Sequence, residues 1–398
     1  MRLSSSNTYG TALESLVDRQ ARLAGTQEQL TTGKRVNHAS DDPAAAARSE
    51  RALASERRTV ANQRAVDASN NAMTLTESAL GDAGGLLQSA REALVAAGNA
   101  TYSDTERAGV ANQLKGLREQ LFSVANRTDG AGTYLFGGQG SAQAPFVDMP
   151  GGVQFQGTSG QVQAASGEAL PLTMDGEAAW MQARTGNGVF ETRVVASNGG
   201  AVIDPGKVTD PSALTGSTYS LQFSVAAGAT TYSVLKDGLP TPQTNLAFTP
   251  GQAIAVDGMS ATITGAPANG DVFELAPSTS ALSVFGALDK AIADLQTPGR
   301  SNTRIAQDNA FALTRLDSVL GQMNAGRSQV GAVMNRVDAV ADRLSALKLS
   351  SQTERSNAED LDMTQAISDF SNQQTGYDAA LKAYSMVQRL SLFNYLNA

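Results

Sequence analysis

The spacing of apolar residues separates helical ends of the chain from a middle with a different pattern. Between residues 316 and 347 apolar side chains recur at alternating steps of three and four, interrupted only at Gly326. This period predicts a helix about 48 Å long with one apolar side, and such a helix needs a partner helix. The sequence supplies candidate partners about 200 residues upstream. The stripe consists of Leu316, Val319, Met323, Val330, Val333, Val337, Val340, Leu344 and Leu347.

Both termini show the same period with fewer apolar residues. A first helix is predicted to end at Gly33, with Gln20 and Gln27 inside its stripe. A last helix has Gln374 and Gln388 in the same role. The apolar positions proposed to form an assembly interface are Leu13, Leu16, Leu23 and Leu30 in the first helix, and Ile367, Phe370, Tyr377, Leu381 and Tyr384 in the last.

Two further helices are predicted after the first one. Asp42-Pro43 is typical of a helix start, because proline lacks the amide that a first turn leaves unbonded. This helix has apolar residues seven apart, contains the weakening pair Gly84-Gly85 and ends at Gly98. The next begins near Ser103-Asp104 and ends before Asp129.

Residues 141–280 are richer in glycine and alternate apolar with polar or small residues. Turn pairs punctuate the alternation, which predicts β-hairpins. These pairs are Asn187-Gly188, Asp237-Gly238, Asp257-Gly258 and Asn269-Gly270. Helices resume near Ser283, with a break at Pro298-Gly299.

The expected fold is therefore a multidomain α+β protein. Both chain ends together form a long antiparallel helical coiled coil or bundle, and a mainly-β domain is inserted between them. The expected division is a terminal assembly domain of 1–42 with 351–398, a helical bundle of 43–140 with 281–350, and a β domain of 141–280.

Composition narrows the function. The chain has 30 basic and 38 acidic residues, a net charge of −8, which argues against nucleic-acid binding. No apolar run is long enough to predict a membrane span, and no secretory signal is predicted at the start. The sequence contains no cysteine, which excludes disulfides and thiolate metal sites.

No catalytic, cofactor-binding or metal site is predicted. His38 is the single histidine, without the neighbours of a catalytic arrangement. Asp41 and Asp42 are better explained as a helix start than as paired carboxylates. Gly137-Gly138-Gln139-Gly140 lacks the lysine and following helix of a phosphate loop, and the Asp-Gly pairs lack calcium-ligand spacing.

Several segments resemble bacterial flagellins. The run from Thr32 to Ala44, TGKRVNHASDDPA, is similar to the segment that follows the first flagellin helix. The end of the family's N-terminal helical part is similar to Asn126–Gly130 and Tyr134–Gly138 of this chain. The family's final helix is similar to Ser391–Leu396. The resemblance covers about 1–138 and 284–398. Arg184–Phe190 and Gly265–Phe273 resemble segments common in junction-type members.

The resemblance implies a structural protein of the bacterial flagellum and not an enzyme. It implies an extracellular subunit, exported by the flagellar type III apparatus, that joins hook to filament as a short ring between the other junction protein and flagellin. It further implies a cytoplasmic export chaperone bound to the C-terminal helix. Two alternatives stay open: a flagellin that forms the filament itself, and a relative whose β insert acts as an enzyme or adhesin.

The apolar stripes of the two terminal helices are interrupted by glutamines, which leads to a hypothesis about how these helices fold. Their apolar burial is too small to offset an ordering cost of about 1–2 kcal/mol per residue. We therefore expect them to be loose in the free subunit and to fold when copies pack together, while the longer helices 43–97 and 303–349 pair within each subunit.

Overall fold

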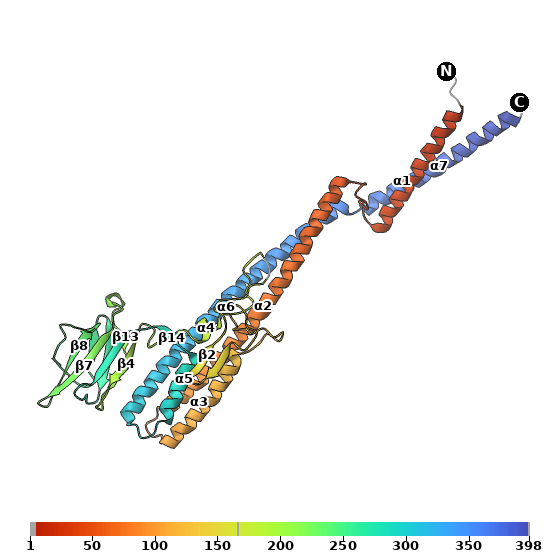
Figure 1. Ribbon diagram of the computed structural model, residues 1–398. Coiled ribbons are helices and arrows are strands. Elements are labelled where there is room, and N and C mark those ends of the chain that lie inside the picture. The colour runs from red at the N-terminus through yellow and green to blue at the C-terminus, as the bar shows by residue number, and fades with distance from the viewer. Residues whose placement is uncertain (1–4, 165–166, 397–398) are drawn as a thin grey trace. The chain divides into compact units, whose positions relative to one another are not determined.

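The computed structural model describes residues 5–164 and 167–396, which divide into two compact units. Unit 1 comprises the described parts of 1–64 and 340–398, and unit 2 comprises those of 65–339. Two long helices, α2 (Pro43–Ala97) and α6 (Asn302–Glu359), contribute to both units (Figure 1). The division therefore falls inside these helices and not at 42/43 and 350/351, where the helical domains were expected to meet.

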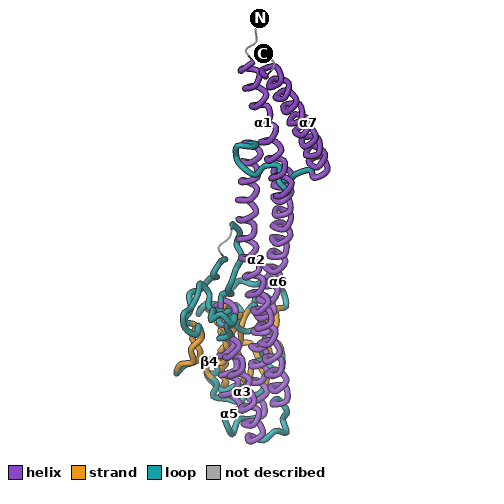
Figure 2. The backbone as a smooth tube through the Cα atoms, turned by 90° about the vertical axis from the view of Figure 1, so that its right-hand side faces the viewer, coloured by secondary structure: helices purple, strands orange, loops and turns teal. Residues whose placement is uncertain are grey.

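Unit 2 contains a helical core. The later part of α2 and the earlier part of α6 lie beside α3 (Asp104–Ala125) and α5 (Val284–Gln296) (Figure 2). Arg91 of α2 pairs with Asp317 at 2.7 Å, and Arg327 of α6 pairs with Glu77, so α2 and α6 run antiparallel. Their buried contacts include Leu80, Leu87, Leu94, Leu316, Val319 and Met323. The predicted partner helix upstream is thus α2.

The apolar stripe of α6 has the predicted burial at most positions. Val333 is half-buried and Leu347 is 48% exposed, whereas the other seven are buried. The interruption at Gly326 has a local cause. A Cβ at this position would lie 3.2 Å from Met174 Cε, so the glycine makes room for a side chain that packs across the helix pair.

The helix ends follow the predicted signals. Asp42 Oδ1 accepts from the Ala45 amide at 2.9 Å where α2 begins. Ser103 and Glu106 form a reciprocal capping box at the start of α3, and Ser103's side chain accepts from the Glu106 amide. Ser283 caps α5 in the same way through the Gly286 amide. The pair Gly84-Gly85 lies within the uninterrupted α2.

The segment that follows α3 belongs to the helical core. It contains β1 (Phe146–Met149), β2 (Gly152–Phe155) and the short α4 (Gly176–Trp180). Trp180 is fully buried and stacks on Phe285 of α5 with ring centroids 5.8 Å apart. Arg118 of α3 pairs with Asp289 of α5 and, at 2.6 Å, with Asp148 of β1, and this hydrogen bond lowers the pKa of Asp148. Residues 141–183 therefore pack with the helices and not with the β insert.

The separate β core begins at Phe190, later than the expected boundary at 141. One sheet has the order β10-β8-β7-β13-β4, with β9 paired to β8, and the other has β11-β12-β5, with β6 paired to β12. Their apolar faces form one buried cluster. The strands are β4 (Phe190–Ala196), β5 (Val202–Ile203), β6 (Lys207–Val208), β7 (Tyr219–Ala226), β8 (Ala229–Lys236), β9 (Leu239–Pro240), β10 (Leu246–Ala247), β11 (Ala253–Val256), β12 (Met259–Thr264) and β13 (Val272–Pro277).

Two of the four predicted turn pairs form two-residue hairpins. Asp237-Gly238 joins β8 to β9, and Asp257-Gly258 joins β11 to β12, with positive φ at all four residues. Asn187-Gly188 and Asn269-Gly270 lie in turns that precede β4 and β13. The alternation therefore predicted the β structure, and the turn pairs located its bends.

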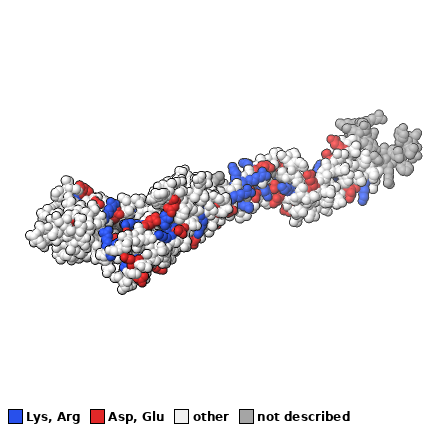
Figure 3. Space-filling view, turned by 60° about the horizontal axis from the view of Figure 1, so that its bottom comes forward, with Lys and Arg blue, Asp and Glu red and all other residues white. Residues whose placement is uncertain are grey.

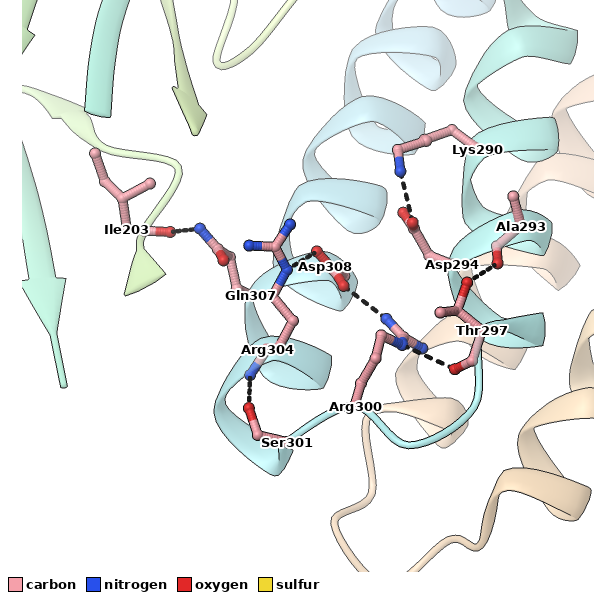
Figure 4. A network of polar contacts seen from close by, with 10 residues as sticks. All are labelled: Ile203, Lys290, Ala293, Asp294, Thr297, Arg300, Ser301, Arg304, Gln307 and Asp308. Atoms are coloured by element: carbon pink, nitrogen blue, oxygen red, sulfur yellow. Dashed lines mark hydrogen bonds and ion pairs between the residues drawn. The ribbon is translucent and has the colours of Figure 1, made fainter. Parts of the chain in front are cut away.

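The β core is joined to the helices by two neighbouring connections. β3 (Ala183–Arg184) pairs with β14 (Ser280–Leu282), so the chain enters and leaves side by side. A third link comes from α6, where Gln307 Nε2 donates to Ile203 O at 3.1 Å (Figure 4). Beside it, Asp308 pairs with Arg300 at 2.6 Å and with Arg304 at 3.3 Å, which secures the turn between α5 and α6. The molecule is thus an α+β protein with a β-rich insert.

Candidate assembly surface at the two ends of the chain

Unit 1 brings the two ends of the chain together. Here α1 (Ser5–Thr32) packs against α7 (Met363–Leu396). Thr26 Oγ1 donates to Gln373 Oε1 at 3.0 Å, so polar residues contribute to the contact. A Cβ at Gly376 would lie 3.1 Å from a guanidinium nitrogen of Arg19, so the Arg19 side chain of α1 reaches across to α7 at this position.

Most of the nine predicted interface residues keep solvent-exposed surface in this pair. Leu16 is buried, and Leu23, Leu30, Phe370, Tyr377 and Tyr384 are half-buried. Leu13, Ile367 and Leu381 are 53%, 56% and 48% exposed. The pair thus covers part of the predicted stripe and leaves several large apolar groups in water, a pattern that marks interaction surfaces when such groups gather.

Further exposed apolar residues lie on the same two helices. Val17 is 56% exposed, Met363 is 46% exposed and Met386 is 64% exposed. Met363 belongs to the three–four stripe of α7, and Val17 lies one turn after Leu13 on the same side of α1, whereas Met386 lies on another side of α7. Periodicity finds residues that share one side of a helix, so an exposed residue on another side, such as Met386, is identified only by the structure.

A polar joint connects the turn before α2 to the turn before α7. The Arg35 amide donates to Glu359 O at 2.7 Å, and the Leu361 amide donates to Gly33 O at 3.0 Å. Lys34 pairs with Glu359 at 3.3 Å. The predicted polar turn thus pairs with the end of α6, at the place where α1 ends and α7 begins.

The two aspartates of this joint act as local caps. The His38 amide donates to Asp41 Oδ2 at 2.8 Å, and this bond is the main cause that lowers the pKa of Asp41. The Ala45 amide, followed by Arg35 at 3.2 Å, lowers the pKa of Asp42. Both carboxylates are therefore held ionised in the roles expected of a helix start, and their oxygens bind backbone amides of the same turn.

The other residues considered for chemistry also have structural surroundings. His38 is 67% exposed at its side chain, with Nδ1 3.9 Å from Glu28 and 4.0 Å from Asp41. Gly138 lies against the backbone of Thr158. Among residues 5–164 and 167–396, no group of three or more His, Asp or Glu side chains is arranged to hold a metal ion. Within the same ranges, no helix combines the length and apolar character that a membrane crossing needs.

Comparison with known families matches both ends of the chain. Residues 3–141 match the bacterial flagellin N-terminal helical region, and residues 313–396 match the bacterial flagellin C-terminal helical region. The first match ends just after α3 and the Gly137-Gly138 turn. The second covers α7 and most of α6, so the matched regions include the whole of the α1–α7 pair.

Individual relatives extend the match over the insert. Flagellar hook-associated protein 3 of Escherichia coli K12 is 27% identical over 398 residues, covering 99% of each chain. Flagellin B of Vibrio anguillarum is 24% identical over 358 residues, covering 85% of this chain and 84% of its own.

A solved structure agrees in fold. The crystal structure of flagellar hook-associated protein-3 from Legionella pneumophila is 26% identical, with a TM-score of 0.68, and the match covers 77% of this chain and 96% of that one. The chain therefore belongs to the bacterial flagellin family, and its full-length likeness is to flagellar hook-associated protein 3.

Proposed function

We propose that this chain is a structural subunit of the bacterial flagellum that joins the hook to the filament. The observation that carries the proposal is the match to flagellar hook-associated protein 3 over 99% of both chains, β insert included. The exposed apolar residues of α1 and α7 support a structural role, because they provide contact area for neighbouring subunits.

The assembly step uses the surface that the α1–α7 pair leaves open. Leu13, Ile367 and Leu381 each expose about half of their surface. Burial of such groups against equivalent helices of neighbouring copies contributes about 25 cal/mol per Å² of apolar area. Because the gain exists only between copies, it favours self-association. The likeness to flagellar hook-associated protein 3 supports the proposed form of the assembly, a short ring with the other junction protein on one side and flagellin on the other.

The same exposed surface supports a proposal about delivery of the subunit. Before assembly, Leu381 and Met386 of α7 are exposed and would promote association in the cytoplasm. A cytoplasmic export chaperone that covers the C-terminal helix prevents this until the flagellar type III apparatus exports the chain. The mature location is extracellular, at the hook–filament junction.

The alternative function is that of a flagellin, which forms the filament itself. The 24% identity to flagellin B over 85% of this chain supports this alternative. Position along the flagellum separates the two functions. A tag inserted at Ala227-Gly228, in the exposed turn between β7 and β8, leaves the terminal helices unchanged.

Electron microscopy of flagella with gold bound to this tag is the test. We expect label confined to one short zone between hook and filament. Label along the whole filament would instead establish the flagellin function, and absence of label from intact flagella that contain the other junction protein would reject both.

A further inference from the structure

The first turns of α2 carry an unusual concentration of positive charge for this chain. Residues 43–64 contain five arginines and two glutamates, a net charge of +3 in a protein whose net charge is −8. All five arginines are exposed. We call this surface the basic band; it consists of Arg48, Arg51, Arg57, Arg58 and Arg64.

Carboxylates of the same chain leave the basic band largely unneutralised. Arg57, Arg58 and Arg64 have no ion-pair partner among the described residues. Arg48 and Arg51 donate their Nε–H groups to backbone carbonyls of their own helix. Glu56, which lies among them, already accepts from Gln352 and Arg355 of α6.

The neighbouring surface of α6 adds apolar area. Leu347 is 48% exposed and lies one turn before Ser351, on the same side of α6. Ser351 Oγ bonds to Ser55 Oγ at 3.1 Å, which places this part of α6 beside the basic band. In the space-filling view, Lys and Arg side chains gather on this stretch of the helix pair (Figure 3). The surface is thus basic with an exposed leucine beside it, a combination suited to a protein-binding site.

The complementary charge lies in unit 2 of the same protein. Residues 65–339 contain 24 acidic and 15 basic side chains, a net charge of −9. Opposite potentials on two surfaces guide association and fix the register of the contact. A polyanion such as nucleic acid matches the basic band alone and is repelled by the rest of the chain.

We propose that the basic band of one copy binds unit 2 of a second copy, whose net charge is negative. The two patches differ, so the contact is heterologous, and a heterologous contact repeated between copies generates a ring or a helical array. This inference rests on the proposed structural function and names the contact by which copies are oriented, in addition to the burial of α1 and α7. Because the attraction is between exposed charges, it weakens as ionic strength rises.

Cross-linking of the full-length protein tests the contact. The chain has no cysteine, so Ala54→Cys, an exposed site within the basic band, gives a single attachment point for a thiol-linked photo-cross-linker. Mixing isotope-labelled and unlabelled copies identifies links between molecules by mass spectrometry. We expect links from residue 54 to peptides of 65–339 in another copy, with a yield that falls about tenfold between low and high salt.

Two charge-reversal variants complete the design. Arg57→Glu with Arg58→Glu should lower the yield about tenfold. The control, Lys115→Glu with Arg336→Glu, makes the same change in net charge at exposed sites of unit 2 and should not lower it. Far-UV circular dichroism of each variant must match the parent chain.

Three results would overturn the inference: no link between copies, links only to residues 1–64 and 340–398 of the second copy, or equal loss in both variants. None of them bears on the proposed function, since gold label at the hook–filament junction is an independent observation. Label at the junction without these links would reject the charged contact alone.

Discussion

Close backbone approach at Gly138 shows how one residue can determine the packing of a segment. Gly138 has a φ of 64°, and a Cβ there would lie 1.9 Å from Thr158 O. The Gly138 carbonyl accepts from Thr173 Oγ1, and its amide donates to Met174 O at 3.2 Å. These bonds hold the loops around residues 138, 158 and 174 together, where Met174 contacts the helix pair at Gly326.

Substitution at Gly138 should therefore destabilise unit 2. We expect Gly138→Ala to lower the free energy of unfolding by roughly 3 kcal/mol or more, since the side chain meets a backbone oxygen in addition to the strained φ. Gly130→Ala is the matched control, because Gly130 has a φ of 84° and open space around it, and should cost only about 1–2 kcal/mol. Urea denaturation of both variants provides the measurement, and equal midpoints would show that the contact with Thr158 is unimportant.

Exposure at single positions could not be predicted from the sequence. Leu13 and Leu16 follow the same stripe, yet Leu13 is 53% exposed and Leu16 is buried. Periodicity locates one side of a helix, but the number of helices that cover this side decides burial. Among the described residues of unit 1, α7 is the helix that packs extensively against α1, and half of the stripe stays open.

At the scale of elements, the sequence predicted what depends on local pattern. The helix boundaries at Gly33, Pro43, Ser103 and Ser283 follow from caps, proline and glycine, which act within one turn. The place of 141–183 depends on contacts distant in sequence, such as Trp180 on Phe285. The sequence of 141–183 carries no signal for which core the segment joins, so its glycine-rich texture alone wrongly predicts the β domain, whereas the structure places it in the helical core.

The two terminal helices lead to a prediction about the free subunit. Because their pair exposes Leu13, Val17, Ile367 and Leu381, we expect it to be marginal in a monomer. In hydrogen exchange on a dilute monomer, amides of 10–30 and 365–385 should exchange orders of magnitude faster than those of α3 and α5. Circular dichroism should show nearly the same helical signal per molecule for the full chain and for a chain lacking 1–40 and 352–398.

Protection of the terminal amides in a demonstrated monomer, equal to that of α3, would reject this coupling of folding to assembly. The same holds for extra helical signal from both ends in the full-length monomer. In either case α1 and α7 would be preformed rods, and only their docking would depend on other copies.

At the scale of the whole molecule, each unit has a separate contribution. Unit 2 buries its apolar residues in two internal clusters and is expected to fold alone. Unit 1 contains the joined turns, the basic band and the open α1–α7 surface, and we expect it to make its contacts mainly with other copies. Assembly can therefore be disrupted in unit 1 while unit 2 stays folded.

Incorporation of a Leu381→Asp variant into flagella tests this central claim most directly. Leu381 is 48% exposed, so the change should leave the subunit folded, whereas a carboxylate buried between copies is strongly unfavourable. Leu239→Asp, at a residue 71% exposed in the β core, is the control. Immunoblots of purified flagella and of the culture medium separate failed assembly from failed export. We predict that the Leu381→Asp subunit is found in the medium and absent from flagella, while the control is incorporated normally; normal incorporation of both would contradict the account.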